Sequence, residues 1–380
     1  MISYGRQFID KKDISAVVKV LKSKNLTQGP IVEKFENDLK KFMGSKYCCV
    51  LSSGTGALHL TGLTLGWNER DYVITTPISF LATSNAILYS GAKPIFVDID
   101  KDTYNISAEL VEKMIKNFKK KKNIKALIAT DFAGNPCDWK KLKKISRKYN
   151  FKLINDNCHA LGAKYLNDSK YAQKYADIVT HSYHPVKQIT TGEGGALFTN
   201  DKKIYLKIKQ LRAHGVLRRK KNLPWYYEMT ELGYNYRLTD FQSALGISQL
   251  KKLKLFLKKR NEISKIYNTG FENNNFIKTP KVFNLNKHAF HLYPILIDFK
   301  KIKKTKKMFF NYLKRNNILP QVHYIPIFLQ PYYKKKFNIN IDKFPNTKKF
   351  YEQEVSLPIY YSLKKNEVLK TISLVNKFVK

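Results

Sequence analysis

Short apolar runs alternate with segments of helical period through the first half of the chain. The apolar runs predict strands at Tyr47–Leu51, Tyr72–Thr75, Pro94–Val97, Ala126–Thr130, Lys152–Asn155, Ile178–His181 and Gly195–Thr199. Between most of them, apolar residues recur with helical period at Ala57–Leu65, Phe80–Tyr89, Ala108–Phe118 and Trp139–Tyr149. Strands this apolar need cover on both faces, so the alternation predicts an α/β fold with a mostly parallel sheet between helices. Because ligands of such sheets bind beyond the carboxyl ends of the strands, polar residues at those ends are the first candidates for chemistry.

The pattern changes in the second half. A long amphipathic helix is predicted to begin near Asp240 and to run through Lys259, as the connection to a second unit. Beyond it, strand-like alternation covers His291–Phe299 and Gln321–Ile327, and helical periods cover Lys301–Arg315 and Glu367–Val379. The chain therefore predicts a large α/β domain over residues 1–245 and a smaller α+β domain, with the linking helix, over residues 246–380.

Composition adds a strong positive charge to this picture. Lys and Arg number 70 against 29 Asp and Glu, which gives a formal net charge of +41. Such an excess is typical of nucleic-acid binders. However, only nine of these residues are Arg, and Arg is the residue that makes bidentate and stacking contacts with nucleic acids. We therefore expect no nucleic-acid partner; the alternative, a nucleic-acid binder, would show an affinity that depends steeply on salt.

The four cysteines, Cys48, Cys49, Cys137 and Cys158, include no Cys-x-x-Cys pair. This usage predicts neither a metal site nor a disulfide framework. The first residues lack the apolar core of a signal peptide, and no run of about 18 apolar residues occurs. We expect a reduced, cytoplasmic protein without a membrane partner.

Two polar motifs follow predicted strands in the first half. Ser52–His59 (SSGTGALH) is a glycine-containing turn before a helix, where free backbone N–H groups and a Thr hydroxyl can bind phosphate. An ordinary helix cap uses the same residue types, so this motif alone leaves both interpretations open. Ile154–Ala163 places Asp156 directly after a buried strand. There its carboxylate could accept a hydrogen bond from a cationic ring nitrogen or cap a helix.

Two further motifs lie later in the chain. His181–Ala196 places Lys187 in a constrained loop ahead of a glycine-rich turn, where an amine is a candidate for imine formation. A lysine that faces solvent beside a tight turn would have the same sequence. Leu232–Gly246 places Asn235 and Arg237 in a turn before the long helix, a pattern that an ordinary capped helix start shares.

Together, and in this order, the motifs resemble those of the DegT/StrS-type sugar aminotransferases, which use pyridoxal 5′-phosphate (PLP) on nucleotide-linked keto sugars. The resemblance covers essentially the whole chain and implies the aspartate-aminotransferase-like fold, fold type I. Further matching segments are Leu26–Pro30, Thr75–Ala86, Arg212–Val216, His323–Tyr333 and Glu354–Tyr360. Within the family, the chain is most similar to the transaminases that make UDP-4-amino-4,6-dideoxy-N-acetyl-β-L-altrosamine, a pseudaminic acid precursor.

The resemblance implies cofactor roles for the motifs. Lys187 would form the imine with PLP and later carry the proton, and Asp156 would keep the pyridine nitrogen protonated. Phe80 would lie against the ring face, and His159 near the ring hydroxyl. The residues implied for the phosphate are Gly54, Thr55 and Ser182.

The resemblance also implies partners. Asn235 corresponds to a residue that reaches the phosphate of the neighbouring subunit's cofactor, which implies a homodimer with shared active sites. Glu193, His323 and Tyr324 fall in segments that would line the sugar-nucleotide pocket, although core or turn packing is the alternative for them. Thr27 is assigned to the same pocket.

The activity implied is transfer of an amino group from L-glutamate to C4 of a UDP-linked 4-keto-6-deoxy sugar. Relatives that dehydrate sugars carry His at the position of Lys187, and some bind an iron–sulfur cluster through cysteines. The lysine present here therefore favours transamination over dehydration. The alternatives are the same chemistry on a perosamine-type or 3-keto nucleotide sugar, and a non-catalytic PLP-binding regulator.

Overall fold

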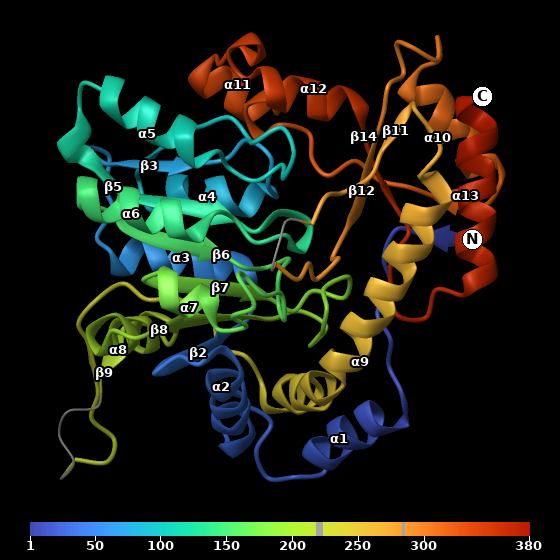
Figure 1. The fold of residues 1–380 in the computed structure, drawn as a ribbon. Coiled ribbons are helices and arrows are strands. Elements are labelled where there is room, and N and C mark those ends of the chain that lie inside the picture. The colour runs from blue at the N-terminus through green and yellow to red at the C-terminus, as the bar shows by residue number, and fades with distance from the viewer. Residues whose placement is uncertain (218–222, 283–285) are drawn as a thin grey trace.

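The computed structural model describes residues 1–217, 223–282 and 286–380. Its largest sheet has the strand order β2-β8-β7-β6-β5-β3-β4 (Figure 1). These strands are β2 (Tyr47–Leu51), β3 (Tyr72–Thr75), β4 (Lys93–Phe96), β5 (Ile124–Thr130), β6 (Lys152–Asp156), β7 (Ile178–Ser182) and β8 (Gly195–Thr199). Neighbouring strands run parallel except at β8, which is antiparallel to both β2 and β7. The α/β class and the mostly parallel sheet are confirmed.

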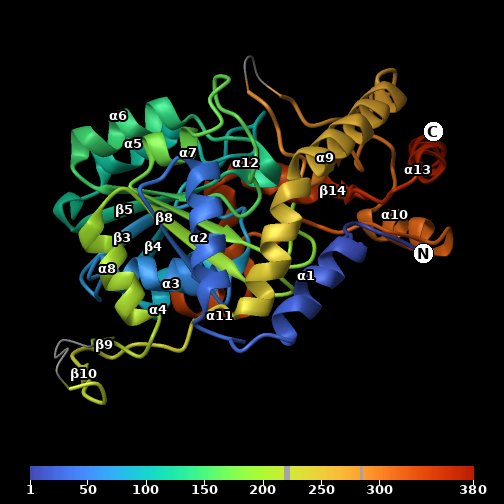
Figure 2. The ribbon, with the colours of Figure 1, turned by 90° about the horizontal axis from the view of Figure 1, so that it is seen from below.

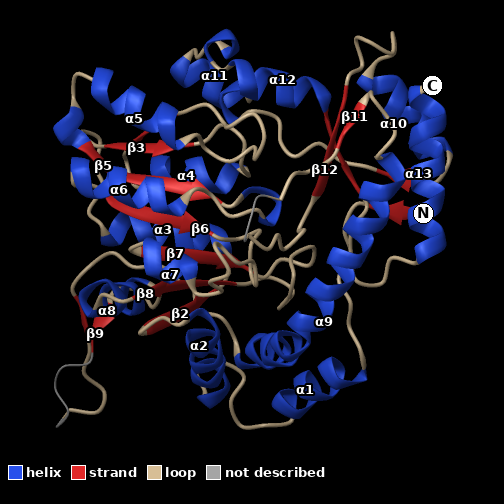
Figure 3. Cartoon of the chain, in the orientation of Figure 1, coloured by secondary structure: helices blue, strands red, loops and turns tan. Residues whose placement is uncertain are grey.

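Helices cover both faces of this sheet because its strands divide their side chains between two apolar cores. In β5, Leu127 and Ala129 pack into one core, whereas Ala126 and Ile128 pack into the other. Helices α2 (Pro30–Met43), α5 (Ala108–Asn117), α6 (Trp139–Tyr149) and α7 (Tyr171–Tyr175) contribute to the first core, and α3 (Gly54–Thr64), α4 (Leu81–Tyr89) and α8 (Lys202–Leu211) to the second. The loops that follow the parallel strands gather on the side that faces the rest of the chain (Figure 3).

The long helix α9 (Asp240–Phe271) leads from this sheet to a separate apolar core, called here the C-terminal core (Figure 1). That core is built on an antiparallel sheet of β11 (Ile277–Lys278), β12 (Tyr293–Ile297) and β14 (Glu354–Leu357), with α10 (Lys306–Arg315) and α13 (Lys365–Val379). Ile2 of β1 (Ile2–Ser3) also packs there, and β1 pairs in parallel with β13 (Ile318–Leu319). We propose the domain boundary at residue 245, as the sequence suggests. In this division β1 belongs to the large domain by its place in the sequence but packs in the C-terminal core.

The remaining helices pack against the large sheet and the long helix α9. Helix α1 (Lys11–Leu21) lies along α9 (Figure 2). Helices α11 (Pro331–Phe337) and α12 (Pro345–Gln353) lie near the β4 edge, where Tyr333 packs against Phe96. The short strands β9 (Val216–Leu217) and β10 (Glu228–Met229) pair as an antiparallel ladder. Within the described part of the chain, no helix is both long and apolar enough to cross a membrane.

Most predicted elements are present, and four of them, β2, β3, β8 and α6, have the predicted bounds. Helix α9 extends beyond Lys259 to Phe271, because Ile263, Tyr267 and Phe271 keep burying its apolar side in the C-terminal core. Helix α10 begins later than expected, since Thr305 caps it by accepting a hydrogen bond from the Met308 amide at 3.2 Å.

The expected strand at Gln321–Ile327 is wrong. Only Gln321 pairs with a strand, through two backbone hydrogen bonds to Ser356 of 2.8 and 3.2 Å. The next amide, that of Val322, turns to the Gln321 side chain, and the amide of His323 donates to a buried carboxylate instead of to a neighbouring strand. Pro326 then provides no amide to continue a ladder. This segment lines a cavity and does not join a sheet.

Candidate active site

A cavity of about 630 Å³ lies at the carboxyl ends of the parallel strands. Most residues predicted for the site line it: Gly54, Thr55, Phe80, Asp156, His159, Ser182, Lys187, Glu193, His323 and Tyr324. Two do not. Thr27 forms a bridge with Thr239 ahead of α9, and Asn235 is exposed in a bridge with Ala213. The fold therefore gathers residues from five separate segments of the chain and leaves these two outside the cavity of a single chain.

The wall that holds the start of α3 is built by backbone contact. Ser53 caps the helix, with its Oγ accepting from the Gly56 amide at 3.0 Å. A Cβ on Gly54 would lie 2.9 Å from the Cβ of Ser182, and a Cβ on Gly195 would lie 2.4 Å from the carbonyl carbon of Ser53. Only glycine permits this approach of β8 to the turn. The first N–H groups of a helix have no acceptor within it, so this wall suits an anion.

Asp156 is the last residue of β6 and is buried, with 5% of its surface exposed. Its Oδ2 accepts hydrogen bonds from Thr83 Oγ1 at 2.7 Å and Thr130 Oγ1 at 3.4 Å, and its Oδ1 accepts from the Cys158 amide at 3.3 Å. These neutral donors fix the carboxylate without neutralising it. A negative charge held at the end of a strand can bind a cationic N–H group in the cavity.

Lys187 lies in the loop between β7 and β8. Its amide donates to the His184 carbonyl at 2.9 Å, and the loop is closed by the Thr191 amide, which donates to the Tyr183 carbonyl at 3.0 Å. Burial lowers the pKa of Lys187, while the nearby Cys158 and Asp156 oppose this shift. A lysine with a lowered pKa is partly available as a neutral amine, which is the form that acts as a nucleophile or base.

His159 forms the floor of the cavity beside Tyr324. Its Nε2 lies 3.1 Å from the Tyr324 hydroxyl, and the two rings lie at 26° with centroids 6.0 Å apart. Burial first, and then the positive charge of Lys187, holds the pKa of His159 well below its usual range. Its Nδ1 is buried and has no hydrogen-bond partner among the described residues. The lowered pKa favours the neutral imidazole, whose Nδ1 can take a further hydrogen bond.

Phe80 and Glu193 stand at the exposed side of the cavity. Phe80 precedes α4 and keeps 57% of its surface exposed, with its ring centroid 6.0 Å from that of Tyr324. Glu193 is also exposed, and its backbone carbonyl accepts from Gln242 Nε2 of α9 at 2.9 Å. Both positions are open to a bound molecule.

Several residues of the cavity were not predicted from the sequence. Thr83 and Thr130 hold Asp156; Thr130 ends a predicted strand beside that of Asp156, so the strand-end rule could have found it. Tyr4 and His291 line the cavity from segments far away in sequence, and no local pattern marks them. The buried His291 ring lies 4.3 Å from that of His159, and the carbonyl of His291 accepts from Arg260 at 3.2 Å.

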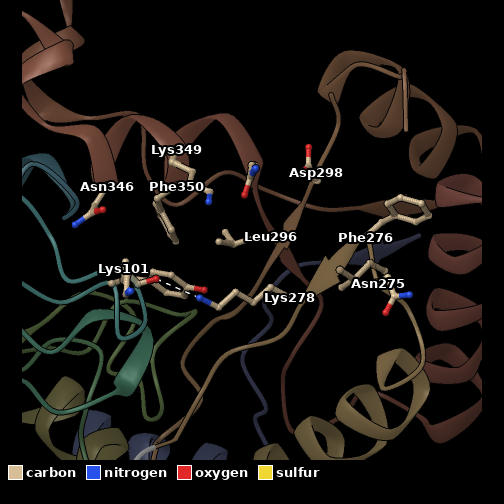
Figure 4. Close-up of a pocket in the computed structure, with 12 residues that line it drawn as sticks. Lys101, Asn275, Phe276, Lys278, Leu296, Asp298, Asn346, Lys349 and Phe350 are labelled. Carbon is tan, nitrogen blue, oxygen red and sulfur yellow. Dashed lines mark hydrogen bonds between the residues drawn. The ribbon is translucent and has the colours of Figure 1, made fainter. Parts of the chain in front are cut away.

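A second, smaller cavity of about 240 Å³ lies apart from these residues, between α12 and the strands β11 and β12 (Figure 4). Lys101, Lys278 and Lys349 line it together with Phe276 and Phe350. Lys278 is paired with Asp102 at 2.9 Å, and the other two lysines are exposed. None of the predicted site residues lies here.

Comparison with known proteins places the chain in a family. The model of the DegT/DnrJ/EryC1/StrS aminotransferase family matches residues 7–376. A UDP-4-amino-4,6-dideoxy-N-acetyl-β-L-altrosamine transaminase of Campylobacter jejuni is 43% identical over 363 residues, 96% of this chain and 93% of that protein. An uncharacterized protein of Methanocaldococcus jannaschii is 42% identical over 98% of this chain and 96% of its own length.

A solved structure agrees with the sequence comparisons. Helicobacter pylori PseC, an aminotransferase involved in the biosynthesis of pseudoaminic acid, superposes with a TM-score of 0.91 at 36% identity, over 99% of this chain and 98% of its own. The chain therefore has the PLP-dependent fold type I that the motifs imply. The resemblance seen in the motifs is confirmed, and the chain belongs to the DegT/DnrJ/EryC1/StrS aminotransferase family.

Proposed function

We propose that this protein moves an amino group from L-glutamate to C4 of UDP-2-acetamido-2,6-dideoxy-β-L-arabino-hex-4-ulose, giving UDP-4-amino-4,6-dideoxy-N-acetyl-β-L-altrosamine for pseudaminic acid biosynthesis. The observation that carries the proposal is that Lys187, Asp156 and the start of α3 line one cavity. The named activity of the Campylobacter relative supports this substrate. The four cysteines are free, which agrees with the cytoplasmic location included in the proposal.

The residues present fit PLP, the cofactor of this family. The start of α3, with Thr55 and Ser182, supplies N–H and hydroxyl donors for a phosphate, and Gly54 and Gly195 permit the close backbone packing that forms this wall. Asp156 supplies an acceptor for a protonated ring nitrogen, and the orphaned Nδ1 of His159 is a polar atom that a ligand can satisfy. When bound, PLP supplies an electron sink for the carbon that loses its proton.

The protein groups then have separate tasks. Lys187 Nζ accepts the proton that leaves the amino donor and returns a proton to C4 of the sugar, which requires a neutral amine. The lowered pKa of Lys187 favours that form. Asp156 holds positive charge on the cofactor's ring, and Thr83 keeps its carboxylate oriented through the 2.7 Å hydrogen bond.

The second substrate would occupy the part of the cavity lined by Glu193, His323 and Tyr324. These groups provide a carboxylate, a phenol, and an imidazole whose buried Nδ1 has no hydrogen-bond partner among the described residues. A sugar ring carrying hydroxyl and acetamido groups could pair with them, whereas an apolar ligand would leave them unsatisfied. Thr27 lies outside this cavity, so its assignment to the sugar depends on a second subunit.

The proposal includes a homodimer with shared active sites. Asn235 is exposed and does not line the cavity of its own chain. Phe80, at the mouth, is also exposed although it is a large apolar residue. A second copy that brings Asn235 to the cofactor phosphate would account for both positions.

A panel of nucleotide keto sugars tests the substrate. With L-glutamate as donor, we expect the highest kcat/KM for the UDP-linked 4-keto-6-deoxy sugar. A higher value for a GDP-linked 4-keto sugar or for a 3-keto sugar would overturn the substrate but keep the chemistry. A protein that binds PLP but gives no 2-oxoglutarate from glutamate would instead be the non-catalytic regulator.

A further inference from the structure

The segment from Gln321 to Ile325 is a wall of the active-site cavity that no sheet holds. All five of its residues line the cavity. Its regular backbone pairing stops after the bridge between Gln321 and Ser356 of β14. Something other than a strand ladder must therefore keep His323 and Tyr324 turned toward the substrate.

A buried carboxylate contacts the segment at this point. Glu354, the first residue of β14, has no exposed surface. Its Oε2 accepts a hydrogen bond from the His323 amide at 2.9 Å, and its Oε1 accepts from the Ser356 hydroxyl at 2.6 Å. Lys306 of α10 supplies the nearby positive charge. Both carboxylate oxygens are thus engaged, one of them by the cavity wall.

The contact between Glu354 and His323 is linked to the reaction site through Tyr324 and His159. His323 and Tyr324 are adjacent, with ring centroids 5.0 Å apart, and the Tyr324 hydroxyl lies 3.1 Å from Nε2 of His159. His159 lines the same cavity as Lys187 and Asp156. A shift of the His323 backbone would therefore displace both a wall residue and the partner of His159.

A carboxyl group is an unusual side chain for a fully buried position of a packed strand such as β14. Val355 and Leu357 pack in the C-terminal core, whereas Glu354 and Ser356 alternate to the opposite face of β14, where a buried carboxyl group is unfavourable unless it is hydrogen-bonded. Replacing a buried, hydrogen-bonded polar group and its partner by apolar groups of the same shape can be nearly neutral or stabilising. Packing alone would therefore favour an aliphatic side chain at this position.

We propose that Glu354 is a positioning residue that holds the His323–Tyr324 wall against the nucleotide-sugar substrate through the His323 amide. The proposal rests on the proposed function for the identity of the substrate, but not for the contact. Glu354 does not itself line the cavity, and its contact with the wall is made through the His323 amide.

Hydrogen exchange of the full protein, followed by mass spectrometry, tests the contact without using activity. Glu354→Leu removes both acceptor oxygens at similar volume, and Glu354→Gln keeps one acceptor for the His323 amide. Glu352→Gln, on the exposed end of α12 where Glu352 pairs with Lys300 at 3.6 Å, is the matched control. In Glu354→Leu we expect amides of residues 321–325 to exchange about ten- to a hundredfold faster, the effect of leaving the buried His323 amide without its acceptor. Glu354→Gln should recover most of this protection, and the control should match wild type.

Kinetics of the same variants test the consequence. KM for the nucleotide sugar should rise about tenfold in Glu354→Leu, while the glutamate half-reaction changes less than about threefold. Unchanged exchange at residues 321–325 in a folded Glu354→Leu protein would overturn the proposal, as would an equal rise across β12, which would mean general loosening. If Glu354→Leu does not fold, the exchange rates of Glu354→Gln decide the test. At residues 321–325 its amides must exchange faster than those of Glu352→Gln, and in β12 the two variants must exchange at the same rate. If exchange behaves as expected but wild type does not aminate the UDP sugar, the substrate assignment fails and the positioning role stands.

Discussion

Gly195→Ala should weaken cofactor binding through the backbone of the phosphate turn. The added Cβ would lie 2.4 Å from the carbonyl carbon and oxygen of Ser53 and 2.6 Å from the amide nitrogen of Gly54. Carbon atoms in contact need about 3.4 Å or more, so the turn must move by roughly 1 Å. These atoms belong to the backbone of Ser53 and Gly54, so a change of side-chain rotamer cannot relieve the contact.

The size of the effect follows from that displacement. Overpacking of this kind lowers the free energy of unfolding by about 1–3 kcal/mol. A misplacement of about 1 Å in a catalytic site reduces the rate by about a hundredfold. We therefore expect PLP affinity, from absorbance titration of cofactor-free protein, to fall at least tenfold, and kcat/KM for glutamate to fall by about a hundredfold.

Gly66→Ala is the matched control. Gly66 follows the C-terminal end of α3, whereas the phosphate turn lies at the start of that helix. Gly66 has φ +68°, and a Cβ there meets nothing within 4 Å. Alanine in this left-handed conformation is destabilising by about 1–2 kcal/mol without touching the site. The two variants should thus lose similar stability, and only Gly195→Ala should lose cofactor affinity. Equal PLP affinity in Gly195→Ala and wild type would refute the assignment of this turn to the phosphate.

Three other outcomes follow from the site. Thr83→Val removes the 2.7 Å hydrogen bond to Asp156, so kcat for the glutamate half-reaction should fall about tenfold in stopped-flow measurements; an unchanged rate would show that Asp156 needs no orientation by Thr83. In the cofactor-free protein the lowered pKa of Lys187 keeps its amine neutral at a lower pH than the amines of exposed lysines. An amine reagent should therefore still label Lys187 at a pH where exposed lysines are protected by protonation. Labelling of Lys187 at the same rate as exposed lysines would contradict this. Burial also lowers the pKa of His181, His288 and His323 to about 3, well below the value of about 6.5 in an unfolded chain. As pH falls below about 6.5 the unfolded state therefore binds protons that the folded state refuses, and each of these histidines lowers the free energy of unfolding by about 2 kcal/mol between pH 7.5 and 5.0. Glu354, whose pKa burial raises to about 8, acts in the opposite direction and offsets part of this loss. Urea midpoints at the two pH values measure the sum, and a higher midpoint at pH 5.0 would refute it.

The elements of the large sheet could be predicted because each strand is a short apolar run between turn residues. Strands such as β2 and β8 are buried along their length and bounded by polar or glycine residues, so local pattern and tertiary burial agree. The same logic failed at Gln321–Ile327, where the His323 amide donates to Glu354 and not to a neighbouring strand. Helices α1 and α2 were not predicted, although Asp10 caps α1 and Pro30 begins α2.

The candidate site divides in the same way. Lys187 and Asp156 lie in motifs next to strand ends, so their gathering in one cavity follows from sheet topology. Tyr4, His291 and Glu354 reach the site region through the N-terminal segment and the C-terminal core, and their partners are distant in sequence. The roles of all the site residues remain proposals, and those of Asn235 and Thr27 also need a second subunit, because a single chain does not bring them to the cavity.

Transfer of nitrogen is the most direct test of the central claim. Purified protein with PLP is incubated with the UDP-linked 4-keto-6-deoxy sugar and with L-glutamate that carries a heavy-nitrogen label, and the sugar product is examined by mass spectrometry and NMR. We predict that the label appears on C4 of the sugar with wild type and is absent with Lys187→Ala. An unlabelled or unaminated sugar with wild type, or labelled product from Lys187→Ala at the wild-type rate, would contradict the account.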